Sequence, residues 1–145
     1  MVAPLKTEAS EVVNVLIGKE GADHVRIKIA LPPVDRHNVE AQVYIRSGPF
    51  LGAFRSFFAI QELAALGKDV EVFSKTLSGA VSLTPLEHSL NFKMEHRGLG
   101  HIQVQGCARP DLVRNTDLHF DFQIDQTFQP RIIGDLAPIL DLARS

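Results

Sequence analysis

The fold is decided by residues 88–126, which read HSLNFKMEHRGLGHIQVQGCARPDLVRNTDLHFDFQIDQ. This stretch contains three runs, His88–His96, His101–Cys107 and Asp117–Asp125, in which apolar and polar side chains alternate. Successive side chains of a β-strand point to opposite faces of its sheet. The alternation therefore predicts three consecutive strands with one face buried and the other in contact with solvent.

Two different connections join these strands. The segment Arg97-Gly98-Leu99-Gly100 is short and rich in glycine, which predicts a hairpin between the first two strands. The segment from Ala108 to Thr116 is longer, polar and contains Pro110. We expect it to be a loop that crosses an open end of the sheet.

The part of the chain before residue 88 has the same kind of pattern. Short β-branched or alternating runs, separated by glycine, proline and polar residues, are typical of strands joined by turns. The predicted strands are Glu11–Ile17, His24–Leu31, Val39–Arg46, Phe50–Phe57 and Ala80–Thr84.

Two segments have the spacing of helices instead. From Ile60 to Leu77 the apolar residues recur every three or four positions, the period of one helical stripe. Gly67 weakens this helix by about 1 kcal/mol relative to alanine and is a position where it could divide. A second stripe runs from Phe128 to Leu140, with Pro130 in its first turn. Pro138 is expected to kink or shorten that helix.

Together these elements predict an α+β fold, an antiparallel β-sheet of about seven or eight strands with two helices packed against it. The length of 145 residues suits a single domain, 1–145, with residues 1–10 as a loose N-terminal end.

The composition is that of an ordinary globular protein. Hydrophobic residues make up 45% of the chain and charged residues 22%, and the formal net charge is −2. This charge gives no electrostatic footprint for nucleic acid. The single cysteine, Cys107, excludes an intramolecular disulfide. The sequence has no signal-peptide core and no run long enough to span a membrane, so we expect a cytoplasmic protein.

Two motifs in the deciding stretch resemble the WapI immunity protein family. The first is Gly100-His101-Ile102-Gln103-Val104 with Gly106, and the second is Phe120–Phe128, which reads FDFQIDQTF. The resemblance extends from Val39 to Leu140. Proteins of this family are cytoplasmic antidotes to a secreted contact-dependent toxin. The resemblance therefore implies a non-enzymatic protein-binding domain whose partner is a protein toxin.

The motif residues also have a structural interpretation. Asp125, Gln126 and Thr127 carry side-chain oxygens that can accept hydrogen bonds from the free N–H groups of a first helical turn. His101 follows the Gly98–Gly100 turn, where its side chain could bond to the backbone and hold the strand register. The residues that we interpret as a structural motif are Gly100, His101, Gly106, Asp125, Gln126 and Thr127.

An enzymatic alternative rests on His101, His119 and Asp121, which share the polar face and could form a small metal-dependent or hydrolytic site. The alternation places His96 on the apolar face, opposite to His101 and His119, so the three histidines do not converge on one point. Cys107 lies on the same face as His119, but contact between them depends on the register of their two strands, which the pattern does not give. We interpret Cys107 as a small, half-buried residue at a strand end. No phosphate-binding loop or dinucleotide fingerprint occurs, and we expect no cofactor or metal.

The polar face of the three strands remains as a candidate binding surface. It is net acidic, which would attract a toxin with a basic surface, although the solvated side of any antiparallel sheet is polar. An unpaired sheet edge offers another alternative, a self-associating structural module or homodimer. We expect neither nucleic acid nor a membrane as a partner. The predicted partner-binding residues are Lys93, Glu95, Gln103, Gln105, Asp117, His119, Asp121 and Gln123.

Overall fold

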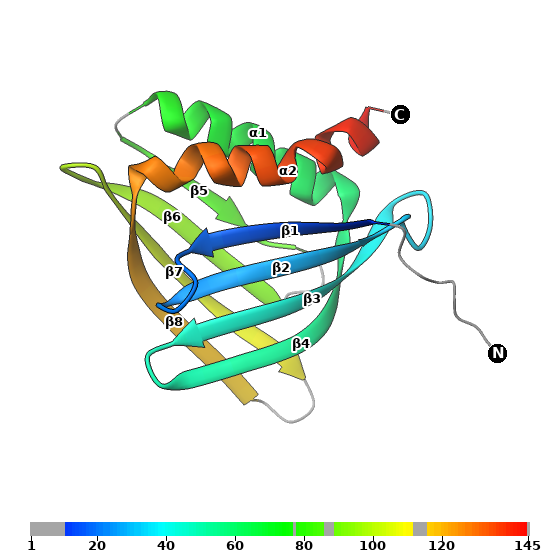
Figure 1. The fold of residues 1–145 in the computed structure, drawn as a ribbon, viewed down its shortest axis with the longest axis horizontal. Coiled ribbons are helices and arrows are strands. Elements are labelled where there is room, and N and C mark those ends of the chain that lie inside the picture. Colours follow the sequence, from blue (N-terminus) through cyan, green and yellow to red (C-terminus); the bar gives the residue numbers. More distant parts are fainter. Residues whose placement is uncertain (1–10, 77, 86–88, 112–115, 145) are drawn as a thin grey trace.

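The structure is a computed structural model that describes residues 11–76, 78–85, 89–111 and 116–144. Within these residues the chain forms eight strands, two α-helices and one short 3-10 helix (Figure 1). The elements are β1 (Glu11–Gly18), β2 (His24–Leu31), β3 (Asn38–Ser47), β4 (Phe50–Ala59), α1 (Ile60–Lys75), β5 (Ala80–Leu83), β6 (Leu90–Gly98), β7 (His101–Asp111), β8 (Thr116–Asp125), η1 (Gln126–Phe128) and α2 (Gln129–Ala143). The predicted loose end at residues 1–10, and the predictions for Leu77 and His88, lie outside the described residues.

The strands form two four-stranded antiparallel sheets, β1-β2-β3-β4 and β5-β6-β7-β8. The predicted α+β class and strand number are confirmed. The strands divide into two sheets because each neighbouring pair within a sheet is joined by a short connection, whereas β4 leads into β5 through the whole of α1. Two stacked sheets bury many of the apolar side chains of their strands between them.

The core lies between the inner faces of the two sheets and beneath the helices. Ile27 and Ile29 of β2, Met94 of β6 and Ile102 of β7 all belong to this core, and each is at most 1% exposed. Alternating burial in β2, β3 and β6 follows the alternation of the sequence. The alternation of apolar and polar residues in the sequence therefore correctly predicts which side chains of these strands point into the core.

The helices pack against each other and against the edge strands of the two sheets. Helix α2 contacts β1, and α1 contacts β5 (Figure 1). Gly67 is buried at the contact between the helices, where its Cα faces Leu136 and Leu140 of α2. It does not divide α1, which runs unbroken from Ile60 to Lys75, and its missing side chain lets α2 approach closely. Pro138 lies inside α2 without ending it, and Pro130 occupies the first turn as predicted.

The connection between β7 and β8 differs from the prediction. Strand β7 continues through Cys107 and Pro110 to Asp111, so the loop predicted for Ala108–Thr116 was wrong for its first residues. Strand β6 pairs with β7 only as far as Ala108, and the register to β8 shifts between Ala108 and Asp111. Pro110 is tolerated here because the regular ladder has already ended. The two strands are thus direct antiparallel neighbours.

Candidate functional site

The candidate site is the outer face of the second sheet, which we call the polar face. It consists of the outward side chains of β6, β7 and β8. The predicted partner-binding residues all belong to it, and each is exposed or half-buried. Its members are Lys93, Glu95, His101, Gln103, Gln105, Cys107, Arg109, Asp117, His119, Asp121 and Gln123.

A hydrogen-bonded group lies in the middle of the polar face. Asp121 of β8 accepts hydrogen bonds from the side-chain amides of both Gln103 and Gln105 of β7, the latter at 3.1 Å. Gln105 lies directly opposite Asp121 in the ladder. The carboxylate and the two amides are therefore held in one arrangement before any partner binds.

The remaining acidic side chains on this face have cationic neighbours. Glu95 Oε1 lies 3.8 Å from Lys93 Nζ and 3.4 Å from the guanidinium of Arg97. Arg109 forms a two-pronged ion pair with Asp117, with nitrogen–oxygen distances of 2.9 and 3.1 Å. The face is therefore less acidic than the prediction held, because the prediction counted neither Arg109, a member of the face, nor Arg97, which pairs with Glu95 beside it.

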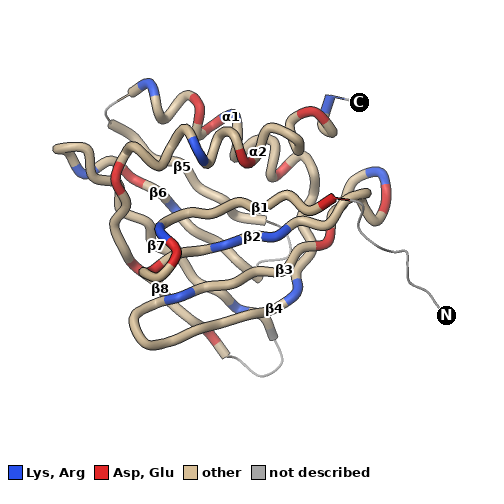
Figure 2. Tube along the Cα trace, in the orientation of Figure 1, with Lys and Arg blue, Asp and Glu red and all other residues tan. Residues whose placement is uncertain are grey.

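Lysine and arginine residues are also present in the strands of the first sheet (Figure 2). Arg26 pairs with Glu20 at 2.9 Å, and Lys28 lies over the ring of Tyr44, 5.4 Å from its centroid. Arg55 pairs with Glu40 at 3.5 Å. Cations are thus distributed over both sheets, and many of them are balanced locally.

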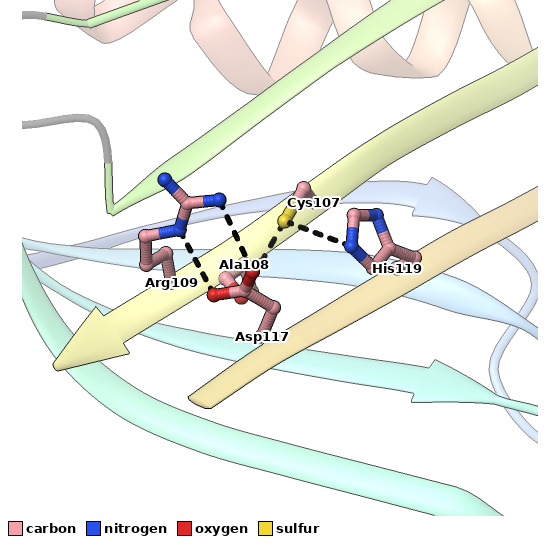
Figure 3. Close-up of polar contacts among 5 residues, drawn as sticks. All are labelled: Cys107, Ala108, Arg109, Asp117 and His119. Atoms are coloured by element: carbon pink, nitrogen blue, oxygen red, sulfur yellow. Dashed lines mark hydrogen bonds and ion pairs between the residues drawn. The ribbon is translucent and has the colours of Figure 1, made fainter. Parts of the chain in front are cut away.

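A second cluster lies near the end of β7 and the start of β8 (Figure 3). Cys107 and His119 are directly opposite in the ladder, and Cys107 Sγ is 3.9 Å from His119 Nε2. Asp117 precedes His119 by two residues and projects from the same face, so a carboxylate oxygen reaches the same point. The ligand atoms of Cys107, Asp117 and His119 all lie within 4.8 Å of one another.

The electrostatics of this cluster follow from its contacts. The hydrogen bond from Arg109 holds the pKa of Asp117 below its usual value. Burial, followed by the negative charge of Asp117, raises the pKa of the Cys107 thiol. Cys107 is therefore a neutral thiol near neutral pH and a weak nucleophile in the protein alone.

The residues of the predicted enzymatic alternative do not converge. His101 lies opposite Asp125, whereas His119 lies opposite Cys107, six residues further along β7. Six residues of strand correspond to about 20 Å. Asp121 bonds to the two glutamines instead of to either histidine. The strand register thus keeps His101 away from any site that His119 could form.

The motif residues have structural contacts. Asp125 Oδ1 accepts from the backbone N–H of Thr127 at 2.9 Å, a cap at the start of η1 that also lowers the pKa of Asp125. Gly106 faces inward, and a Cβ at this position would lie 2.6 Å from both Phe120 Cζ and Phe92 Cβ. Gly100 ends the hairpin turn with a φ of 79°.

His96 points to the inner side, as its parity predicted. Its ring stacks on Phe73 of α1 with centroids 4.0 Å apart, and its Nε2 donates to the Phe73 carbonyl oxygen at 3.0 Å. His96 therefore ties β6 to the last turn of α1, and it has no part in the polar face.

The sequence interpretation missed the cluster of Cys107, Asp117 and His119. The sequence contained one sign of it, because the alternation places all three side chains on the outer face of the sheet. Their meeting could not be derived without the register of β7 on β8, which the alternation of side chains does not give.

In the part of the chain that the structure describes, neither helix is long and apolar enough to cross a membrane. Each sheet has two outer strands, β1 and β4 in the first and β5 and β8 in the second.

Comparison with known proteins places this geometry in context. The family model described as the Immunity protein WapI-like family matches residues 16–143. No curated protein matches the chain. Among solved structures, one titled "Crystal structures of trypanosoma bruciei MRP1/MRP2" is similar over 97% of this chain and 90% of its own, with 9% identity and a TM-score of 0.46.

Proposed function

The chain belongs to the WapI-like immunity protein family, and we propose that it is a non-enzymatic binding protein that neutralises a cognate protein toxin by occluding it. The proposal places the protein in the cytoplasm, where the toxin would act. The polar face of β6, β7 and β8 is the proposed contact surface. Family membership supports the general role, and the geometry of the face supports the choice of surface.

The observation that carries the choice of surface is the arrangement around Asp121. Gln103 and Gln105 both donate to its carboxylate, so these side chains have already lost much of their freedom in the free protein. A surface that is ordered before binding loses less conformational entropy when the partner docks. Among the described residues, no cationic side chain forms an ion pair with Asp121, so its charge can act on a partner.

The expected partner is a toxin with a positively charged surface. Asp121 offers a carboxylate to a cationic side chain of that partner, and the partly exposed ion pairs of Glu95 and Asp117 can exchange their internal cations for external ones. Such an exchange costs little, because exposed ion pairs contribute only about 0.2–1 kcal/mol. Complementary charge would also increase the rate of encounter.

Two features support binding without catalysis. The register of β7 on β8 keeps His101 away from His119 and Asp121. The thiol of Cys107 is neutral near neutral pH because burial raises its pKa. Neither arrangement offers the activated nucleophile and oriented base that hydrolysis requires.

The proposal predicts that a toxin domain is encoded beside this gene, and that domain is the partner for the test. Co-expression with the protein should restore growth of cells that produce the toxin domain. The two purified proteins should form a stoichiometric complex by size-exclusion chromatography with light scattering, and the toxin should be recovered intact. Failure to form a complex would contradict the proposal, as would loss of toxin activity through covalent change of the toxin.

A further inference from the structure

Three side chains with different metal-binding atoms meet on the polar face at Cys107, Asp117 and His119 (Figure 3). The register places the thiol directly opposite the imidazole. The spacing of two residues on β8 brings the carboxylate to the same side as the imidazole. The convergence is thus set by backbone pairing and does not depend on a flexible loop.

We propose that Cys107, His119 and Asp117 form a Zn²⁺ site. With ordinary Zn–S and Zn–N bond lengths, a tetrahedral zinc holds its sulfur and nitrogen ligands about 3.6 Å apart. The separation between Cys107 Sγ and His119 Nε2 is 3.9 Å. Small side-chain rotations therefore close the site around the ion, and the strands keep their positions.

The set of donor atoms selects the metal. A thiolate and an imidazole suit Zn²⁺, whereas Mg²⁺ and Ca²⁺ require a shell made of oxygen atoms. Three protein ligands leave a fourth position of the tetrahedron open. Asp117 and His119 are exposed, so that position faces solvent and takes a water molecule or a side chain of a bound partner.

Binding requires the thiolate. Zn²⁺ displaces the proton of the Cys107 thiol, a Zn–S bond forms, and the proton passes to the solvent.

Arg109 competes with the metal for Asp117. Its guanidinium holds both carboxylate oxygens, and it is a positive charge beside the site. The Arg109 side chain is 45% exposed, so it can turn into solvent when the ion binds. Since an exposed ion pair is weak, a substitution that removes the Arg109 guanidinium should strengthen metal binding by only about twofold to fivefold.

Titration with Co²⁺ tests the site directly, because cobalt bound by a thiolate gives a ligand-to-metal charge-transfer band in the near ultraviolet. The full chain should bind one Co²⁺ with this band and with the visible spectrum of tetrahedral cobalt, and one equivalent of Zn²⁺ should remove both signals. Absence of the charge-transfer band in the wild-type protein would overturn the proposal.

Variants identify the ligands. Cys107→Ser should lose the charge-transfer band, His119→Gln and Asp117→Asn should weaken Zn²⁺ binding, and Arg109→Gln should strengthen it. His101→Gln, a histidine on the same face outside the cluster, is the matched control and should bind like the wild type. Circular dichroism of the metal-free variants shows that they fold. A band that persists in Cys107→Ser, or equal binding by His119→Gln, would refute the assignment.

The site lies within the proposed contact surface, but its test uses the protein alone. Loss of toxin neutralisation without loss of the cobalt spectrum would count against the proposed function only. A missing cobalt spectrum in a protein that neutralises its toxin would count against the metal site only.

Discussion

The backbone N–H of Gln126 donates a hydrogen bond to the carbonyl oxygen of Gly100 at 2.8 Å. These two residues belong to the two separate motifs of the sequence signature. Gly100 immediately precedes β7 and Gln126 immediately follows β8, so the antiparallel pairing brings them together. The bond closes the end of this strand pair at the point where the chain turns into η1 and α2. The signature thus marks a structural junction.

Gly106 is the clearest case of a motif residue required by packing. Gly106→Ala should lower the free energy of unfolding by about 1–3 kcal/mol or more, because the new methyl group meets Phe92, Phe120 and the Asn91 carbonyl oxygen. Urea denaturation measures the change. Gly134→Ala, in α2 with no atom within 4 Å of the added Cβ, should instead stabilise the protein by about 0.5–1 kcal/mol. Equal effects of the two substitutions would show that the contacts at residue 106 are not as described.

The hydroxyl groups of Ser56 and Ser89 are buried and bond to each other. Each alanine substitution alone should cost about 1–3 kcal/mol, because it leaves the other hydroxyl without its partner. The double variant should cost less than the sum of the two single variants. A double-mutant cycle by chemical denaturation measures this coupling. Simple additivity would mean that the two hydroxyls do not depend on each other.

Gln129 is 4% exposed, and its Nε2 has no hydrogen-bond partner among the described residues. Gln129→Leu should therefore stabilise the protein by about 1 kcal/mol, since a buried amide N–H group without an acceptor keeps its full desolvation cost. Thermal unfolding measures the effect. Gln61→Leu, at an exposed position of α1, is the control and should change stability by less than about 0.5 kcal/mol. A destabilised Gln129→Leu protein would indicate that the amide has a partner.

Asp135 of α2 accepts from the backbone N–H of Leu16 at 3.3 Å, and burial raises its pKa above the usual value. The folded protein therefore binds the proton of the Asp135 carboxyl more tightly than the unfolded chain does. Above the folded-state pKa, the negative charge of the Asp135 carboxylate consequently destabilises the fold. This penalty disappears as the pH falls below the unfolded-state pKa of about 3.9. Asp135→Asn should raise the melting temperature at neutral pH, and the difference should vanish under acidic conditions.

The control for this comparison is Asp69→Asn, which removes one negative charge from an exposed position of α1. Melting temperatures of both variants and the wild type, recorded from acidic to neutral pH, separate burial from net charge. A stabilisation by Asp135→Asn that is the same at every pH would contradict the role given to burial.

The polar face can be tested by adding positive charge to it. If the toxin presents a basic surface, Gln123→Arg should weaken the complex by at least about tenfold, through like-charge repulsion at the contact. Gln42→Arg, at another exposed glutamine, on β3 of the first sheet, is the matched control. Isothermal titration calorimetry with the purified toxin domain compares the two. Stronger weakening by Gln42→Arg would move the contact surface to the first sheet.

Much of the fold could be predicted because its signals are local. The alternation of Leu90, Phe92 and Met94 identifies a strand and its inner face without knowledge of any partner strand. The spacing from Ile60 onward likewise identifies α1. The prediction for Gly67 failed in one respect, since local helix propensity cannot show that a second helix will pack against that position.

The candidate site was predicted only in part. Parity alone places Gln103, Asp121 and their neighbours on one face, and that face exists. Whether Cys107 meets His119, and whether Arg109 neutralises Asp117, depends on the register between β7 and β8. A shift of that register by two residues would keep every parity and yet separate all of these pairs.

The sequence by itself determined which segments are strands and helices, and which side of each strand is buried, because these properties follow from the period of apolar residues within a segment. Only the tertiary structure decided that the strands form two sheets, and that Cys107, Asp117 and His119 share one point. Those results depend on contacts between distant segments, on the length of β7 and on the close packing around Gly106, none of which a local pattern contains.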